Sequence, residues 1–151
     1  MALVINEKID YVARDLTPTS QMILENEMNK YGLSNFVPDF HVTLIFSRTR
    51  IDINESDLIK RKDHIVGTGK MEKWEDHEGN DIIVLVLDDN DSVYTFSKRN
   101  EFLLSRGGTN SYPEYRPHIT LTKKPPIGYN VPDDKIIISL AFGEKYINYY
   151  G

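Results

Sequence analysis

The sequence contains no cysteine among its 151 residues. This absence excludes disulfide bonds, thiolate metal sites and a cysteine nucleophile. The sequence also lacks any apolar run near the ~20 residues that cross a bilayer, and residues 1–10 lack the charged and apolar regions of a signal peptide. We therefore expect a cytoplasmic protein without a membrane partner.

Positive charge is scarce as well. Lysine and arginine number 18 against 23 acidic residues, which gives a formal net charge of −5. Proteins that grip long nucleic acids usually present a basic face, because neutralisation of phosphates dominates that affinity. The charge argues against a long DNA or RNA partner, but it allows a small phosphate-bearing substrate held by a few local cations.

The pattern of apolar residues, caps and turns predicts a single α+β domain over residues 1–151. One helix is expected from Thr17-Pro18 to Gly32, and a second from Asp91 or Ser92 to Gly107-Gly108. Strands are expected over residues 8–13, 41–46, 65–77, 82–87, 118–121 and 136–142. The segment 54–60 could form a short helix, and 145–149 could extend the last strand or pair with it. Gly67 and Gly69 predict a bulge or a close backbone approach.

The order strand, helix, histidine strand, strand occurs twice, which predicts a duplicated fold. The segments 35–41 and 110–118 both run from Asn through Pro, an acid and an aromatic residue to His, and Arg116-Pro117 is inserted in the second. We expect a bilobed, pseudo-twofold protein with one lobe over about 1–78 and the other over about 79–151, and an exchange of strands between lobes is compatible with this arrangement. The two lobes would enclose the active cleft.

Two tetrapeptides carry the chemistry: His41-Val42-Thr43-Leu44 and His118-Ile119-Thr120-Leu121. Side chains alternate on a strand, so His and Thr share one face while Val42 and Ile119 point into the core. Two imidazoles that titrate near neutral pH can act as a base and an acid. The threonine hydroxyls can donate hydrogen bonds to the charged oxygens of a phosphodiester transition state.

A lone His-x-Thr on a strand carries no functional signal. Two copies that share the apolar residue, the leucine and the approach segment are much harder to produce by accident. The sequence has no His-x-His, no His-Glu-x-x-His and no dense carboxylate run beside either histidine, so we expect neither a metal nor another cofactor.

In these motifs the chain resembles the two-histidine phosphoesterase superfamily, which has two His-x-Thr or His-x-Ser motifs in a bilobed α+β fold. Within it, the chain is similar to the anti-CBASS nucleases of tailed phages. The resemblance implies metal-independent hydrolysis of cyclic di- and trinucleotide messengers at 3′–5′ linkages, which would counteract antiviral signalling in the host cytoplasm. It also implies that His41 and His118 are the base and the acid, in either order, and that Thr43 and Thr120 hold the scissile phosphate.

Aromatic and polar side chains near the motifs are candidates for contacting the bases. These substrate-binding candidates are Tyr11, Trp74, Tyr112, Tyr115 and Glu144. Each has an alternative: the aromatic rings could simply pack, and Glu144 could be a solvated surface acid. Arg116, Lys123 and Lys124 could attract phosphate or face solvent, while His64 and His77 are expected on the surface or in turns.

Two other functions fit the same motifs. The chain could be a 2′,3′-cyclic phosphodiesterase acting on RNA or tRNA ends, or a non-catalytic protein that sequesters cyclic nucleotides. Sequestration needs no acid–base pair, which favours the enzyme. A monomer or a weak dimer is expected.

Overall fold

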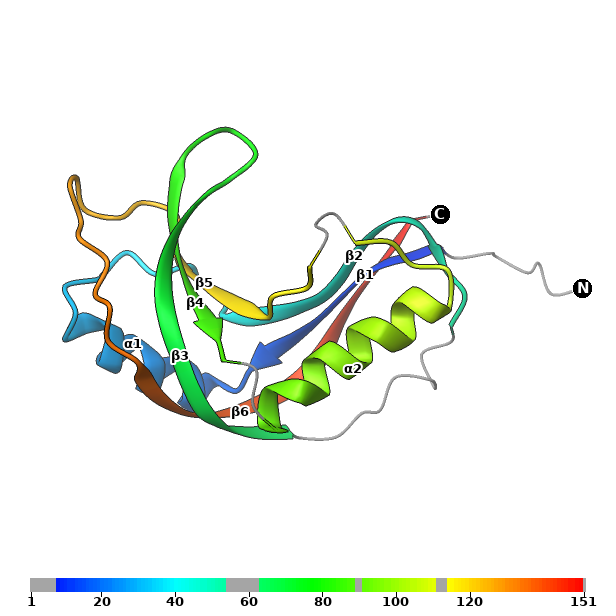
Figure 1. Ribbon diagram of the computed structural model, residues 1–151, viewed down its shortest axis with the longest axis horizontal. Coiled ribbons are helices and arrows are strands. Elements are labelled where there is room, and N and C mark those ends of the chain that lie inside the picture. The colour runs from blue at the N-terminus through cyan, green and yellow to red at the C-terminus, as the bar shows by residue number, and fades with distance from the viewer. Residues whose placement is uncertain (1–7, 54–62, 89–90, 111–113, 151) are drawn as a thin grey trace, which may run out of the picture.

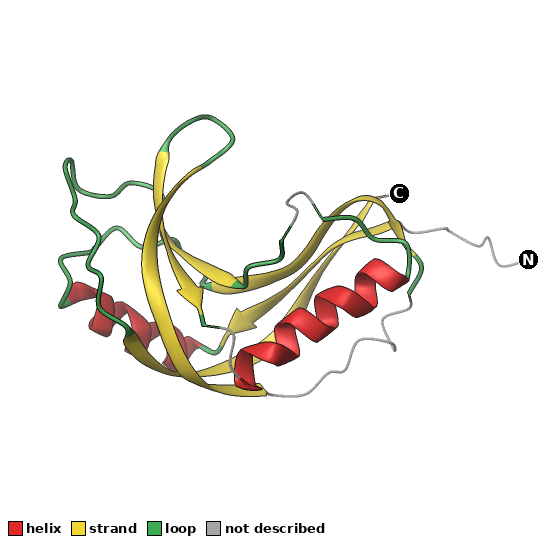
Figure 2. Cartoon of the chain, viewed as in Figure 1, coloured by secondary structure: helices red, strands yellow, loops and turns green. Residues whose placement is uncertain are grey.

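The computed structural model describes residues 8–53, 63–88, 91–110 and 114–150. It has an α+β fold with two helices and six antiparallel strands (Figures 1 and 2). The elements in chain order are β1 (Lys8–Leu16), α1 (Pro18–Asn29), β2 (His41–Ile51), β3 (Asp63–Glu75), β4 (Asp81–Leu87), α2 (Asp91–Ser105), β5 (His118–Thr122) and β6 (Ile136–Tyr150).

The strands form a closed ring in the order β1-β2-β5-β4-β3-β6. Every neighbouring pair is antiparallel. Closure removes the unpaired edges that an open sheet would expose. Exchanging β1 with β4, β2 with β5, and β3 with β6 reproduces the same order of neighbouring strands.

The core confirms the expected apolar pattern. The run Ile83–Leu87 in β4 is buried throughout, as expected for a strand covered on both faces. Val42 of β2 and Ile119 of β5 are also fully buried. Helix α1 packs against β1 and β6, and α2 packs against β2 and β3; in Figure 1 both helices lie below the turn that joins β3 to β4.

Both helices begin and end near the predicted positions. Thr17 caps α1 by accepting a hydrogen bond from the Ser20 amide at 3.2 Å, and Pro18 is the first helical residue. After α2, Gly107 adopts φ +96°, and the Gly108 amide donates to the Leu103 carbonyl at 3.1 Å. A left-handed residue at this place ends a helix at little cost when it is glycine.

The structure settles the bounds of β2 and β6 and the register of β3. Strand β2 extends beyond residue 46 to Ile51, and β6 is one continuous strand to Tyr150, so residues 145–149 extend it. Strand β3 pairs with β4 and β6 in unbroken register over the residues described. Glycine at position 69 is explained by the close approach of Leu85 from β4 and not by a bulge, because a Cβ at this position would lie 2.9 Å from Leu85 Cδ1. The possible helix over 54–60 lies outside the described residues.

A register shift interrupts the pairing of β1 with β2. Val12 pairs with Ile45 and Ala13 with Thr43, so Leu44 is an extra residue in β2. Leu44 and Ile45 are consequently both buried, and the alternation of faces resumes in the opposite phase after them. This is a β-bulge directly after the first motif.

No helix in the described part of the chain is long and apolar enough to cross a membrane.

Candidate active site

The two motifs lie side by side because β2 pairs with β5 through Val42 and Ile119. In an antiparallel pair with this register, His41 lies opposite Thr120 and Thr43 lies opposite His118. Opposite residues on one face have Cβ atoms about 4.5–5.5 Å apart and diagonal ones about 7–8 Å apart. By this register the two histidines occupy diagonal corners of a His/Thr rectangle formed by His41, Thr43, His118 and Thr120.

Both imidazoles are oriented by the same local contact. His41 Nδ1 lies 3.1 Å from the carbonyl oxygen of Asp39, and His118 Nδ1 lies 2.8 Å from that of Arg116. A carbonyl can only accept, so each contact assigns the proton of the neutral ring to Nδ1 and leaves Nε2 as the acceptor. The shared i−2 contact gives two equivalent imidazoles that can each exchange a proton through Nε2.

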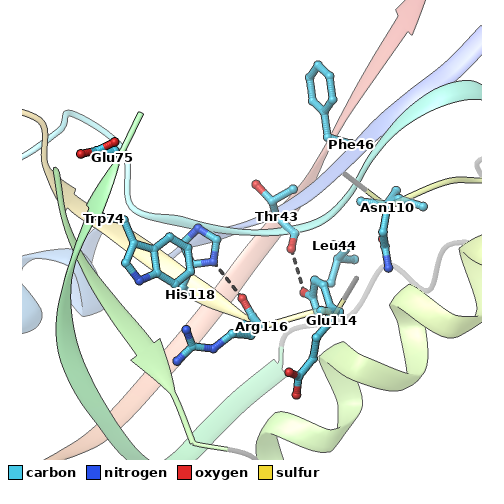
Figure 3. Close-up of a pocket in the computed structure, with 11 residues that line it drawn as sticks. Thr43, Leu44, Phe46, Trp74, Glu75, Asn110, Glu114, Arg116 and His118 are labelled. Atoms are coloured by element: carbon cyan, nitrogen blue, oxygen red, sulfur yellow. Dashed lines mark hydrogen bonds between the residues drawn. The ribbon is translucent and has the colours of Figure 1, made fainter. Parts of the chain in front are cut away.

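A cavity of about 780 Å³ opens beside the second motif (Figure 3). Pockets of about 300–1,000 Å³ hold small-molecule ligands. Thr43 and His118 line the cavity, whereas His41 and Thr120 lie outside its described lining. The other lining residues are Leu44, Ile45, Phe46, Trp74, Glu75, Asn110, Glu114, Tyr115 and Arg116.

Trp74 lies in the wall of this cavity, against His118. Their ring centroids are 4.4 Å apart, and the rings are tilted by 57°. The Glu72 carboxylate accepts from Trp74 Nε1 at 3.0 Å and from both terminal nitrogens of Arg116, at 3.1 and 2.5 Å. The Arg116 guanidinium is also 5.5 Å from the Trp74 ring. Glu72 thus binds two residues that contact His118: Trp74, whose indole packs on the imidazole, and Arg116, whose carbonyl oxygen lies next to Nδ1.

These surroundings lower the pKa of His118. Burial is the largest cause, since it penalises the charged ring, and the positive charges of His41 and Arg116 act in the same direction. The Arg116 carbonyl and the charge of Glu72 oppose the shift. The lowered pKa favours the neutral form of His118 at neutral pH.

Thr43 is held by two tyrosines. Its hydroxyl lies 3.0 Å from the Tyr11 hydroxyl, and its carbonyl accepts from the Tyr115 hydroxyl at 2.7 Å. Burial raises the pKa of Tyr115, so this phenol stays protonated and keeps donating. When Tyr11 donates to Thr43, the Thr43 hydrogen remains available for a ligand oxygen.

Carboxylates lie beside the first histidine, contrary to the expectation from the sequence. Ligand atoms of Asp15, Asp39 and His41 all lie within 4.8 Å of one another, and this is the group of possible metal ligands found among the described residues. Strand pairing places Asp15 across from His41. Sequence spacing could not reveal this group, because Asp15 is distant in the chain.

The remaining candidates are placed differently. Lys123 and Lys124 line a separate hollow with Lys73 and Asp76, so they do not approach the His118 cavity. His77 is exposed in the β3–β4 turn, as expected. His64 and Glu144 lie in β3 and β6, but their side chains are not among those described, and Tyr112 lies outside the described residues.

Sequence reasoning missed Glu72, Phe46 and Asn110. A signal for Glu72 was present, because it lies two residues from Trp74 on the same face of a strand. Phe46 carried a misleading signal, since strict alternation from Thr43 would turn it inward. Asn110 was noted only as part of the approach segment.

The fold and the site define a small α+β barrel protein with a paired His-x-Thr site. Residues 8–147 match the sequence profile of a family described as "Anti-CBASS protein Acb1". The Anti-CBASS protein Acb1 of Vibrio phage KVP40 is 32% identical over 114 residues, which cover 74% of this chain and 70% of that protein. The chain belongs to the Anti-CBASS protein Acb1 family.

The contacts of Glu72 make a prediction for the charge state of His118. Glu72→Gln removes a charge that raises the pKa of His118 and leaves the Arg116 cation without its carboxylate partner. The midpoint of the His118 titration, followed by NMR of the imidazole carbons and nitrogens, should move to lower pH. Folding should change by no more than about 1 kcal/mol, because the ion pair is partly exposed.

Glu27→Gln is the matched control, because Glu27 also forms an ion pair, with Lys30 at 3.0 Å, on the surface of α1. It should leave the His118 midpoint unchanged. An unchanged or raised midpoint in Glu72→Gln would show that Glu72 does not control this ring.

Proposed function

We propose that the protein is a phosphodiesterase that cleaves cyclic di- or trinucleotide messengers at 3′–5′ linkages, using His41 and His118 as its acid–base pair. The chain would thereby counteract the CBASS signalling of the host, as its family's name suggests. The observation that carries the proposal is the pairing of Val42 with Ile119, whose register supports a common face for the two histidines and the two threonines.

The reaction needs one proton removed and one supplied. The 2′-hydroxyl of the substrate attacks the phosphorus, its proton passes to one imidazole, and the 5′ oxygen leaves with a proton from the other. The product is a linear chain with a 2′,3′-cyclic phosphate, which water can open. Thr43 and Thr120 would donate to the non-bridging oxygens, where negative charge accumulates.

The asymmetry of the two surroundings favours His118 as the base and His41 as the acid. A base must be neutral before the reaction, and burial lowers the pKa of His118. His41, the other histidine of the pair, would be the acid, and the carboxylates of Asp15 and Asp39 lie beside it. Both imidazoles would use Nε2, since both Nδ1 atoms face backbone carbonyls.

The aromatic candidates take different parts in this proposal. Trp74 would form the wall for one base, and its contact with His118 would bring that base close to the reaction centre. Tyr115 also borders the cavity, but its hydroxyl is used by Thr43, so it would offer only its ring. Tyr11 would act through the Thr43 hydroxyl. Glu144 and Tyr112 remain predictions as substrate contacts.

A duplicated ancestor would account for the geometry. The twofold ring of strands and the repeated strand-helix-strand-strand order support a pair of related halves, divided near the β3–β4 hairpin. Under that relation β2 corresponds to β5, and His41 to His118. Membership of the two-histidine phosphoesterase superfamily, which we also propose, would follow from the same correspondence.

Incubation with a panel of cyclic di- and trinucleotides, with and without excess chelator, followed by chromatography, tests the proposal. We expect cleavage in both conditions. His41→Ala and His118→Ala should each lower the rate by about 10²–10⁴-fold, the range for a lost acid or base. His77→Ala, on the exposed turn, should retain full activity.

Other outcomes of this panel would identify one of the two alternative functions. Tight binding without cleavage would indicate a sponge, and preference for 2′,3′-cyclic ends of RNA would indicate the second enzyme. Cleavage abolished by chelator would contradict the metal-free mechanism and direct attention to Asp15, Asp39 and His41. Full activity in either histidine variant would refute the acid–base pair.

The pH dependence of kcat/KM should be bell-shaped. Activity should fall on the acid side as His118 gains the proton that stops it acting as a base, and on the alkaline side as the general acid of the pair loses its proton. Because the pKa of His118 is lowered, the acid limb should lie below the ordinary value of about 6.5. A profile without an acid limb would contradict the role of His118.

A further inference from the structure

Phe46 is an exposed aromatic side chain inside the cavity. It is 53% exposed although it lies in β2, and it lines the same cavity as Thr43, His118 and Trp74. Large apolar side chains on strands usually turn into a core or pack under other elements. An open aromatic face in a concave site calls for a functional explanation.

The β-bulge at Leu44 turns Phe46 into the cavity. Thr43 and Phe46 are three residues apart, so in a regular strand their side chains would point to opposite faces. The extra residue reverses the phase, and Phe46 emerges on the face of the His/Thr rectangle. Bulges beside active sites characteristically re-aim a side chain in this way.

Side chains from two other elements stabilise the bulge. A bulge interrupts the ladder of backbone hydrogen bonds, so its carbonyls need other donors. The Asn100 amide donates to the Leu44 carbonyl at 2.7 Å, and the Tyr115 hydroxyl donates to the Thr43 carbonyl at 2.7 Å. Asn100 is almost fully buried, so its contact with Leu44 is part of the core of the fold.

Phe46 is oriented by its neighbour across the strands. The Tyr11 ring meets it edge to face, with centroids 5.6 Å apart and an interplanar angle of 68°. Such a contact fixes a ring while leaving one of its faces open for stacking. Tyr11 also contacts the Thr43 hydroxyl. The same tyrosine therefore orients both the Phe46 ring and the hydroxyl group of the first motif.

Two aromatic residues therefore flank the reaction centre. Figure 3 shows Trp74 and His118 on one side of Thr43, with Phe46 and Asn110 on the other. The Asn110 amide is paired with that of Asn100 through bonds of 2.9 and 3.2 Å. An amide nitrogen carries two N–H donors, so Asn110 can serve Asn100 with one and a base edge with the other.

We infer that Phe46 is the stacking platform for the second base of the substrate, the one on the opposite side of the scissile phosphate from Trp74. A 3′–5′ phosphodiester joins two nucleosides, so a phosphate held at Thr43 directs one base toward Trp74 and the other toward Phe46. Base–aromatic stacking tolerates any base, because every base has a π face. This inference rests on the proposed function. It requires a substrate with a base on each side of the scissile phosphate, whereas a 2′,3′-cyclic phosphate at an RNA end has a base on one side only.

The test compares a 3′–5′ cyclic dinucleotide with an analogue in which one nucleotide lacks its base. Phe46→Ala should weaken binding of the complete dinucleotide about 5–100-fold, the loss expected for truncating a stacking aromatic residue. The loss should appear in KM and in the dissociation constant measured in the inactive His118→Ala background, with kcat little changed. The wild-type protein should bind the analogue about as weakly as Phe46→Ala binds the dinucleotide.

Matched variants separate stacking from structural damage. Phe46→Trp should retain affinity and Phe46→Leu should lose it, while the thermal midpoints of all three variants stay near that of the wild type, because the ring is half exposed. Unchanged affinity in Phe46→Ala would overturn the inference, as would an equal loss for the dinucleotide and the analogue. Absence of cleavage by the wild-type protein would refute the proposed function instead, and the binding measurements would still decide the role of Phe46.

Discussion

The contact on which the site depends is the antiparallel pairing of Val42 with Ile119. These two fully buried side chains join β2 to β5, the strands through which the two parts of the chain meet. A shift of either strand by one residue would turn the histidine and the threonine of that strand into the core. The burial of two apolar residues on one face therefore fixes the positions of four polar residues on the other.

Neighbouring contacts give the two equivalent histidines different properties. His118 is buried against Trp74, and Glu72 holds both that indole and Arg116. His41 lies instead beside Asp15 and Asp39. The backbone contact is the same in both cases, so the difference between the two surroundings comes from the neighbouring side chains. The proposed division of catalytic roles rests on this difference between the two surroundings.

The sequence allowed most elements and both motifs to be predicted, because caps, alternation and apolar runs are local. The His/Thr pairs follow from a period of two on single strands. The sequence could not reveal Asp15 beside His41 or Glu72 beside Arg116, since both contacts depend on which strands are neighbours. The position of Phe46 could not be predicted for a different reason: an inserted residue reverses the alternation of side chains, and the extra Leu44 looks like any other apolar residue in the sequence.

In the proposed reaction the two imidazoles divide the proton transfers, with His118 as base and His41 as acid. The most direct measurement uses a cyclic dinucleotide whose 5′ bridging oxygen is replaced by sulfur, because a thiolate leaves without protonation. His41→Ala should then recover most of the wild-type rate, while His118→Ala should remain as defective as it is on the oxygen substrate. Recovery in His118→Ala would reverse the assignment, and equal defects in both variants on both substrates would contradict the division of roles.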